Sequence, residues 1–262
     1  MSSESLEKDP QFAYTLARGL QVLRAFEGKS ASLGNREIGE IVGIPRSTAA
    51  RLTRTLALLG YLQYDQPTQR YRLTAAMLTL AYPVLAQLPV RKVARPHMQE
   101  LANQVQGSVS LAMRDGLQLV LVESCVDPKA VTRPDIGAVR EMGSTALGMA
   151  YLAAQEPVAR DELLAQVIAH APSKSPVVRP NALSAIQAEF KRFADTGFCL
   201  SVDELAGTRA VGVPLRLPGI DTMSLNCVVA SHLASPQQML QGAGPRLVKL
   251  ARDLELLMGY NA

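Results

Sequence analysis

The sequence predicts an α+β protein in which an N-terminal winged helix-turn-helix is joined by a linker helix to a larger domain with an antiparallel sheet. Two observations predict this fold. A helix-turn-helix pattern followed by a hairpin pattern fills residues 35–73, and the remaining two thirds mix strand patterns with helix patterns. Of the 262 residues, 48% are apolar and only 5% aromatic, which is enough for a sizeable core rich in Leu, Ala and Val.

The helix-turn-helix is predicted from turn and helix signals at residues 35–59. Residues 35–42 have apolar residues at helical spacing, and Gly43 suits a tight turn between helices. Pro45 fits the first position of a second helix, and Gly60 fits the position just beyond its end. The predicted buried face of this second helix comprises Thr48, Leu52, Leu56 and Leu59.

A hairpin completes the winged motif, because residues 61–64 and 70–73 alternate like strands around a turn-rich connector. Five arginines lie between residues 41 and 75 against one acidic residue, Asp65. Such a surface neutralises phosphates, and arginine can read guanine in the major groove. The alternative is a three-helix structural module with a solvated basic face. The predicted DNA-binding residues are Arg46, Ser47, Thr48, Ala50, Arg51, Arg54, Arg70 and Arg72.

These residues also carry a family resemblance. The stretch IPRSTAARLTRTLALLGYL, followed by YRLT, resembles the IclR family of bacterial transcriptional regulators. The positions that match the family's helix pattern are Pro45, Arg46, Ser47, Thr48, Arg51, Leu52 and the closing Gly60-Tyr61-Leu62. The resemblance implies a regulator that binds operator DNA as a homodimer or homotetramer.

The segments that flank the motif set the expected domain limits. Residues 1–12 are predicted to be a disordered arm. A helix over residues 14–26 has an apolar face, including Leu16, Leu20, Leu23 and Val22 or Phe26, that is wider than a small domain needs. The resemblance implies that it also contacts a second copy. With Thr74 as the cap of a linker helix, we expect domains at 13–74, 75–91 (linker) and 92–262.

The elements of the second domain follow from the same signals. Asp115-Gly116 predicts a hairpin, residues 127–142 read as a charged loop, and Gly197 should end a helix. The expected helices are 93–105 (with Val93, Met98, Leu101 and Val105 inward), 144–154, 161–169, 182–196 and 236–258. The expected strands are 108–113, 118–124, 198–201, 209–217 and 222–231.

The second half resembles the GAF-like effector-binding domain of the IclR family. The matching pieces are residues 143–148 (GSTALG), Gly197-Phe198, residues 203–207 (DELAG), Ala210 and Val213-Pro214. The chain departs from the family at two places. Residue 149 is methionine, where the family often has lysine, and the acidic pair Asp203-Glu204 lies about one residue closer to Gly207 than is usual in the family. The resemblance implies an effector that is an organic or aromatic acid of a catabolic route.

The residues themselves also predict an anionic ligand. Unpaired N–H groups at the start of the helix near Ser144 form an anion site, and small residues after it leave room against a sheet. Asn226 is polar within an apolar strand, so it needs a ligand or a protein partner, and both remain open. Strand parity puts Asn226 and Val228 on one face. The predicted effector-binding residues are Ser144, Thr145, Ala146, Leu147, Ser201, Asp203, Ala210, Asn226 and Val228.

Other classes of function find less support in the sequence. There is no nucleophile elbow, zinc-protease motif or phosphate loop, so we expect neither an enzyme nor a cofactor. The three histidines lack metal-ligand spacing, so we expect no metal site. The three cysteines and the polar N-terminus predict reduced thiols in a cytoplasmic protein with no contact with membranes. The rival function is a metabolite-binding or catalytic protein whose winged helix docks protein.

Overall fold

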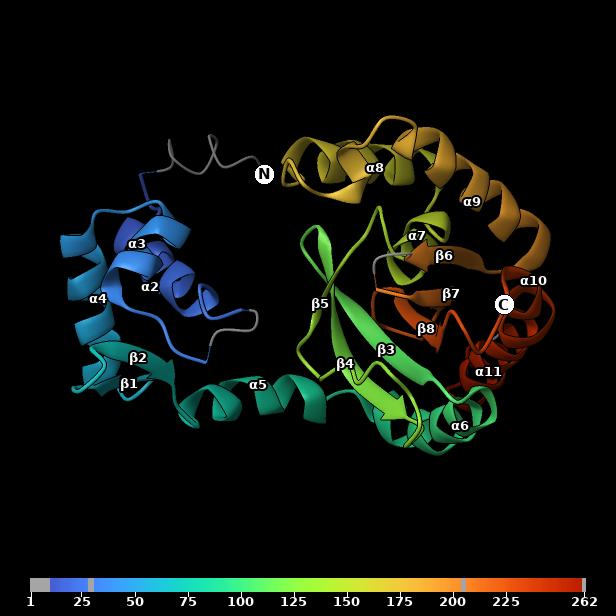
Figure 1. The fold of residues 1–262 in the computed structure, drawn as a ribbon, viewed down its shortest axis with the longest axis horizontal. Helices are drawn as coiled ribbons and strands as arrows, with labels where there is room; N and C mark the ends of the chain where they lie inside the picture. Colours follow the sequence, from blue (N-terminus) through green and yellow to red (C-terminus); the bar gives the residue numbers. More distant parts are fainter. Residues whose placement is uncertain (1–9, 28–30, 204–205, 261–262) are drawn as a thin grey trace. The chain divides into compact units, whose positions relative to one another are not determined.

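The computed structural model describes residues 10–27, 31–203 and 206–260, and it forms two compact units, Met1–Gln87 and Leu88–Ala262 (Figure 1). Residues 1–12 were predicted to be a disordered arm, and residues 1–9 of it lie outside the described part of the chain. Each unit has its own hydrophobic core, and the two are described separately below.

The N-terminal unit is a winged helix-turn-helix with one further helix. Its elements are α2 (Tyr14–Arg24), α3 (Asn35–Val42), α4 (Arg46–Leu58), β1 (Leu62–Asp65), β2 (Arg70–Leu73) and α5 (Ala76–Ala86). Gly43 and Gly60 adopt left-handed backbone conformations, with φ of 72° and 82°, at the ends of α3 and α4. Glycine adopts this conformation without a steric penalty because it has no Cβ atom, and this allows the chain to turn at both positions. The core comprises Val22, Phe26, Leu33, Ile38, Ala49, Leu56, Leu62 and Tyr71.

The buried face of α4 is rotated from the predicted one. Ala49, Thr53 and Leu56 are buried, whereas Thr48 is only partly buried and Leu59 is 64% exposed. The pattern was misread because Thr53 is polar, yet its hydroxyl donates a hydrogen bond of 2.8 Å to Asn35 Oδ1 at the start of α3. A satisfied hydroxyl can be buried at little cost. Pro45 is the N-cap, one position outside the helix.

Helix α5 is apolar but exposed. It begins at Ala76 rather than at Thr74, whose hydroxyl instead accepts the Ala76 N–H at 3.3 Å from outside the helix. None of the residues of α5 is buried, and Leu78 is 70% exposed. On α2, only Val22 is buried, while Leu16 and Leu20 of the predicted apolar face are exposed. The N-terminal unit therefore carries more apolar surface than its own core covers.

The C-terminal unit is built on a six-stranded sheet in the order β5-β4-β3-β8-β7-β6, in which every neighbouring pair is antiparallel. Its strands are β3 (Ser108–Asp115), β4 (Gln118–Val126), β5 (Val139–Glu141), β6 (Cys199–Asp203), β7 (Thr208–Leu215) and β8 (Met223–Ala230). Its helices are α6 (Pro89–Val105), α7 (Ala146–Ala153), α8 (Pro157–His170), η1 (Pro176–Val178), α9 (Ala182–Thr196), α10 (Pro236–Gln238), η2 (Met239–Ala243) and α11 (Gly244–Leu257).

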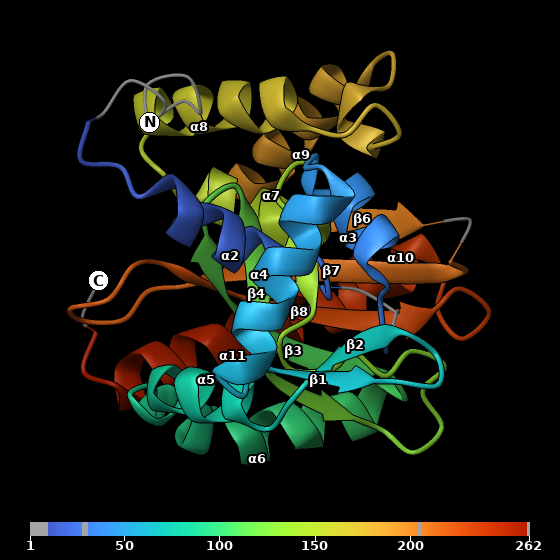
Figure 2. The ribbon, with the colours of Figure 1, turned by 90° about the vertical axis from the view of Figure 1, so that its left-hand side faces the viewer.

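The helices cover the sheet on both faces. Helices α6 and α11 pack on one face, and α7, with α8 and α9 beyond it, packs on the other (Figures 1 and 2). Because side chains alternate along a strand, the face under α6 and α11 receives the odd-numbered residues of β3, β7 and β8, which are apolar except for Asp115 and Arg209. The face under α7 receives the even-numbered ones, which include Ser108, Ser110 and Asn226. The two faces thus differ in polarity.

A bulge in β4 changes which residues face each side. Leu111 pairs with Glu123 and Ala112 with Leu121, so Val122 is the extra residue. Leu121 consequently packs in the core beneath α7. Glu123 lies on the other face, where it forms ion pairs of 3.2 Å and 2.7 Å with Arg91 and Arg95 of α6. A buried carboxylate is tolerated here because two guanidinium groups compensate its charge.

Helix α7 rests almost directly on the backbone of the sheet. A Cβ atom at Gly212 of β7 would lie 2.1 Å from the Ala146 carbonyl oxygen. One at Gly148 of α7 would lie 2.3 Å from the Met142 backbone. No larger side chain fits at either position, and this fixes where the start of α7 lies above β7.

Several predicted boundaries in this unit need correction. Helix α6 starts at Pro89 instead of residue 93, because Pro89 opens the helix rather than breaking it, and Val90 and Ala94 are buried instead of Val93 and Val105. The predicted loop 127–142 contains β5. The last helix is interrupted by η2, a π-helical turn. By contrast, α9 and its left-handed Gly197 lie where they were predicted.

We predict that Gly212→Ala destabilises the C-terminal unit by about 1–3 kcal/mol, because the new methyl group meets rigid backbone. The measurement is thermal unfolding followed by circular dichroism. Gly242→Ala is the matched control, because a methyl group added there would have no atom within 4 Å. Equal unfolding temperatures for the two variants would contradict the packing described for α7.

Candidate functional site

The outer surface of α4 carries uncompensated positive charge. Arg46, Arg51 and Arg54 are exposed, and within the described residues none of them forms an ion pair. Ser47 is exposed beside them, whereas Thr48 and Ala50 are partly buried. Three guanidinium groups lie on the outer surface of one helix, and the wing follows this helix in the chain. Together they form a surface that can bind a phosphate backbone.

Arg70 of the wing has a different environment. Its guanidinium lies 2.9 Å from Glu37 and also donates to the backbone and hydroxyl oxygens of Ser32, so it fastens β2 to the start of α3. The Gly34 N–H and the Arg70 guanidinium both hold the pKa of Glu37 below its ordinary value. That Arg70 contacts DNA stays a prediction, and its ion pair with Glu37 compensates part of the charge it would bring to DNA. Arg72 is exposed and donates to Gln63.

The C-terminal unit contains a cavity of about 920 Å³ between the sheet and the start of α7. It is lined by Ser108, Ser110, Leu121, Thr132, Arg133, Pro134, Arg140, Ser144, Thr145, Ala146, Pro176, Arg179, Ser201, Val202, Asp203, Ala206, Thr208, Ala210, Asn226 and Val228. All the predicted effector-binding residues except Leu147 are among them. Leu147 does not line the cavity and is fully buried in the hydrophobic core around α7.

The floor of the cavity is polar. Ser108, Ser110 and Asn226 are all at least nine-tenths buried. Within the described chain, Ser108 Oγ and Asn226 Oδ1 have no protein hydrogen-bond partner. Such buried atoms are costly to leave unpaired, so they point to a bound polar molecule or to water. The opposite face of the same strands is apolar, which confines the polar groups to the cavity side.

The start of α7 is held by Glu141. The hydroxyl of Ser144 donates to the Glu141 carboxylate at 2.7 Å, and that of Thr145 donates to the Glu141 carbonyl oxygen at 2.7 Å. Thr145 Oγ1 also accepts the Gly148 N–H, as the N-cap of α7. The hydroxyl protons expected to reach a ligand are therefore used inside the protein. The first N–H groups of the helix have no intrahelical acceptor, so they remain available as donors to a ligand.

Three arginines that sequence reasoning missed also line the cavity. Arg140, on β5, is partly buried, and burial holds the pKa of its guanidinium below the ordinary value. Arg133 and Arg179 are exposed and come from the loop before β5 and the residue after η1. The abundance of charge in residues 127–142 was the available signal, but nothing in that loop's pattern indicates that it folds over the sheet.

Other chemistry finds little support in the described residues. Among residues 10–27, 31–203 and 206–260, no group of three or more His, Cys, Asp or Glu side chains could hold a metal ion. Cys125, Cys199 and Cys227 are buried free thiols, and burial raises the pKa of Cys227 to about 12. In the described part of the chain, we find no helix with the length and apolarity that a membrane crossing requires.

Comparison with known proteins identifies both units. The family model described as the IclR helix-turn-helix domain matches residues 15–66. The model described as the bacterial transcriptional regulator IclR C-terminal domain matches residues 82–253. The second match alone covers more than half of the chain, so the assignment rests on the cavity-bearing unit as well as on the winged motif.

Individual relatives agree. The chain is 30% identical to the HTH-type transcriptional regulator TsaQ1/TsaQ2 of Comamonas testosteroni, over 96% of this chain and 91% of the relative. It is 27% identical to the Pca regulon regulatory protein of Pseudomonas putida, over 94% and 84%.

Solved structures share the fold. A regulator from Brucella abortus has a TM-score of 0.84 and 32% identity, covering 98% of this chain and 97% of that one. A homologue from Microbacterium hydrocarbonoxydans, solved with 4-hydroxybenzoate, has a TM-score of 0.67 and 22% identity, covering 91% and 99%.

Proposed function

Because this chain belongs to the IclR family of DNA-binding transcriptional regulators, we propose that a small organic or aromatic acid in the cavity controls its binding to operator DNA. The observation that carries this proposal is the polarity of the cavity. A partly buried guanidinium and the open end of a helix supply donors for an acid group, and the unpartnered Asn226 amide oxygen in the same cavity would accept a hydrogen bond from a hydroxyl of the ligand. No cofactor is needed for this role.

The ligand is an anion because the cavity supplies positive charge with little to neutralise it. Within the described residues, Arg140 donates only to its own neighbour's carbonyl, Val139 O, at 2.8 Å. Burial removes part of the hydration of this guanidinium, and none of the described acidic residues forms an ion pair with it. A carboxylate ligand would compensate its charge and can accept two parallel hydrogen bonds from it. The helix dipole of α7 adds to this attraction. The 4-hydroxybenzoate found in the Microbacterium homologue supports an aromatic acid as the first class to test.

The proposed DNA contacts lie on α4. Arg46 and Arg51 lie in the first half of the helix, where side chains of a recognition helix reach base edges, and Arg54 and Arg72 are proposed to contact phosphates. Arg70 stays a predicted contact, with part of its charge compensated by Glu37. Ser47, Thr48 and Ala50 lie between these arginines and complete the proposed surface.

We also propose that the chain binds DNA as a homodimer or homotetramer. Leu16 and Leu20 on α2 and Leu78, Leu80 and Tyr82 on α5 are exposed apolar side chains of one unit. Apolar surface of this kind marks an interface. A second copy of the chain fits, because one winged helix reads too few base pairs and two copies read a pseudo-palindrome.

We predict that Arg46→Ala or Arg51→Ala weakens binding to a specific site by about 1–3 kcal/mol, because direct contacts with bases are lost. The measurement is a gel shift with a duplex that the full-length protein has enriched from random sequences. Lys249→Ala in the C-terminal unit is the charge-matched control. Equal losses on the enriched and on random duplexes would show that these arginines contact phosphates alone.

We predict that Arg140→Gln keeps binding to the enriched duplex but needs about tenfold more acid to respond, since it loses a charge-assisted hydrogen bond. A thermal-shift screen of carboxylates, beginning with 4-hydroxybenzoate, selects the acid, and a gel-shift titration measures the response. Lys249→Gln should respond like the wild type. If Arg140→Gln responds at the same acid concentration as the wild type, the effector does not bind in this cavity.

We predict that the wild type sediments as a dimer or tetramer without DNA and that Leu78→Glu shifts it toward monomer, because a charge then has to be buried in the interface. Analytical ultracentrifugation at micromolar concentration measures this, with circular dichroism to check folding. Val158→Glu on α8, at another exposed apolar residue, is the control. A wild-type monomer that binds a half-site tightly would contradict the assembly.

A further inference from the structure

The described lining of the cavity carries more positively than negatively charged side chains. Three arginines line it, and Asp203 is the one acidic residue among the described lining residues. Asp203 accepts the N–H of Ala206 at 2.9 Å, and none of Arg133, Arg140 and Arg179 has an ion pair within the described part of the chain. The described lining therefore carries an excess of two positive charges, counted as three arginines minus one aspartate.

The three arginines come from different segments. Arg140 is partly buried on β5, whereas Arg133 and Arg179 are exposed. A ligand that reaches Arg140 and the start of α7 with one acid group leaves the other two arginines without an anion. One carboxylate thus neutralises only part of the excess.

The segments that carry the outer arginines are held in place. Arg133 donates to the Pro128 carbonyl oxygen at 2.8 Å, which ties its guanidinium to its own loop. Arg179 follows η1, and the N-cap of η1, Ser175, donates to Glu141 at 2.8 Å. The same Glu141 oxygen accepts the Ser144 hydroxyl at the start of α7. One carboxylate thus connects the segment that bears Arg179 to the start of α7.

We propose that the effector is a dianion with two separated acid groups, of which one binds Arg140 and the start of α7 and the other binds Arg133 and Arg179. This proposal rests on the proposed function and sharpens it. A dicarboxylate fits better than a phosphate ester, because a phosphate puts both charges at one point. A cavity of about 920 Å³ has room for such a molecule, since ligand sites typically measure about 300–1,000 Å³.

The test compares acids that differ by one carboxylate. Terephthalate is paired with benzoate and adipate with hexanoate, and inorganic phosphate is the compact anion. Isothermal titration of the full-length protein, at a fixed ionic strength of about 0.15 M, gives each Kd. We expect at least one dicarboxylate to bind about tenfold or more tightly than its monoacid partner, and more tightly than phosphate.

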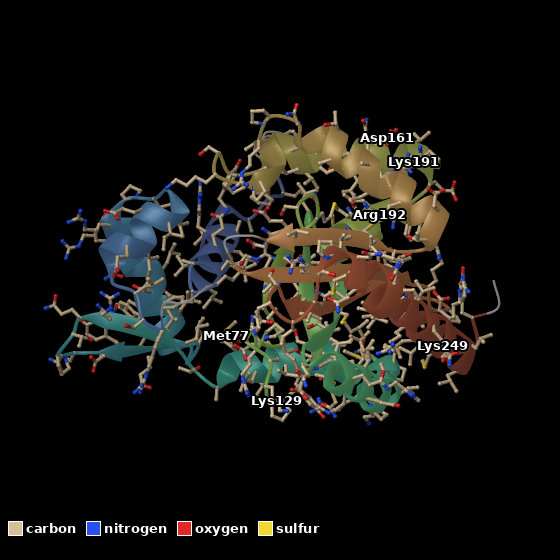
Figure 3. The ribbon with its side chains drawn as sticks, turned by 45° about the vertical axis from the view of Figure 1, so that its right-hand side comes forward. Met77, Lys129, Asp161, Lys191, Arg192 and Lys249 are labelled. Carbon is tan, nitrogen blue, oxygen red and sulfur yellow. The ribbon has the colours of Figure 1, made fainter. Side chains whose placement is uncertain are left out.

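The variant that isolates the second acid group is Arg133→Gln with Arg179→Gln. Both side chains are exposed, so the double variant should fold like the wild type. In this variant the Kd ratio between dicarboxylate and monoacid should fall to near one, because the dicarboxylate loses more binding free energy than the monoacid does. The control is Lys191→Gln with Lys249→Gln, which removes the same charge from α9 and α11, at exposed lysines outside the cavity lining (Figure 3).

The outcomes separate this inference from the proposed function. Equal binding of the two members of each pair, or phosphate that binds as tightly as the dicarboxylates, would overturn the dianion and leave an anion-responsive regulator. An advantage for the dicarboxylate that survives in the arginine double variant would overturn the assignment of the second acid group. If none of the acids binds the wild type, both the dianion and the proposed acid effector are wrong.

Discussion

The contact between α7 and the backbone of β7 is the constraint on which the cavity depends. With no side chain at Gly212 or Gly148, the helix approaches the strands until its first carbonyl group almost touches them. The start of α7 then opens over the part of the sheet that carries Ser108 and Asn226. A helix held farther away by ordinary side chains would leave those polar groups open to water. The cavity is therefore a result of backbone packing as much as of the residues that line it.

Features with a local cause could be predicted from the sequence. The turns at Gly43, Gly60 and Gly197 follow from a backbone conformation that glycine adopts easily, and the hairpin at Asp115-Gly116 follows from its turn residues. That Asn226 and Val228 share a face follows from strand parity, whereas the choice of this face for the cavity rested on the polar Asn226.

Features that depend on distant residues could not be predicted. Arg133 and Arg179 reach the cavity because the loop before β5 and the segment of a short 3-10 helix fold over the sheet, and neither segment has a periodic pattern. The ion pair of Arg70 could not be predicted, because its partner, Glu37, lies 33 residues earlier in the chain. Thr53 was left out of the core because its hydrogen bond to Asn35 spans two helices. In each case the environment of a polar side chain is set by residues that are far from it in the sequence.

The bulge at Val122 has a consequence for how relatives of this protein are compared. One extra residue lets β4 present Leu121 to the cavity and, two positions later, Glu123 to the arginines of α6. An alignment that opens or closes a one-residue gap elsewhere in this strand would equate ligand-facing positions of one protein with helix-facing positions of another. Effector specificity inferred from such columns would be assigned to the wrong side of the sheet. Alignments of this strand should therefore be anchored at the bulge before their residues are compared.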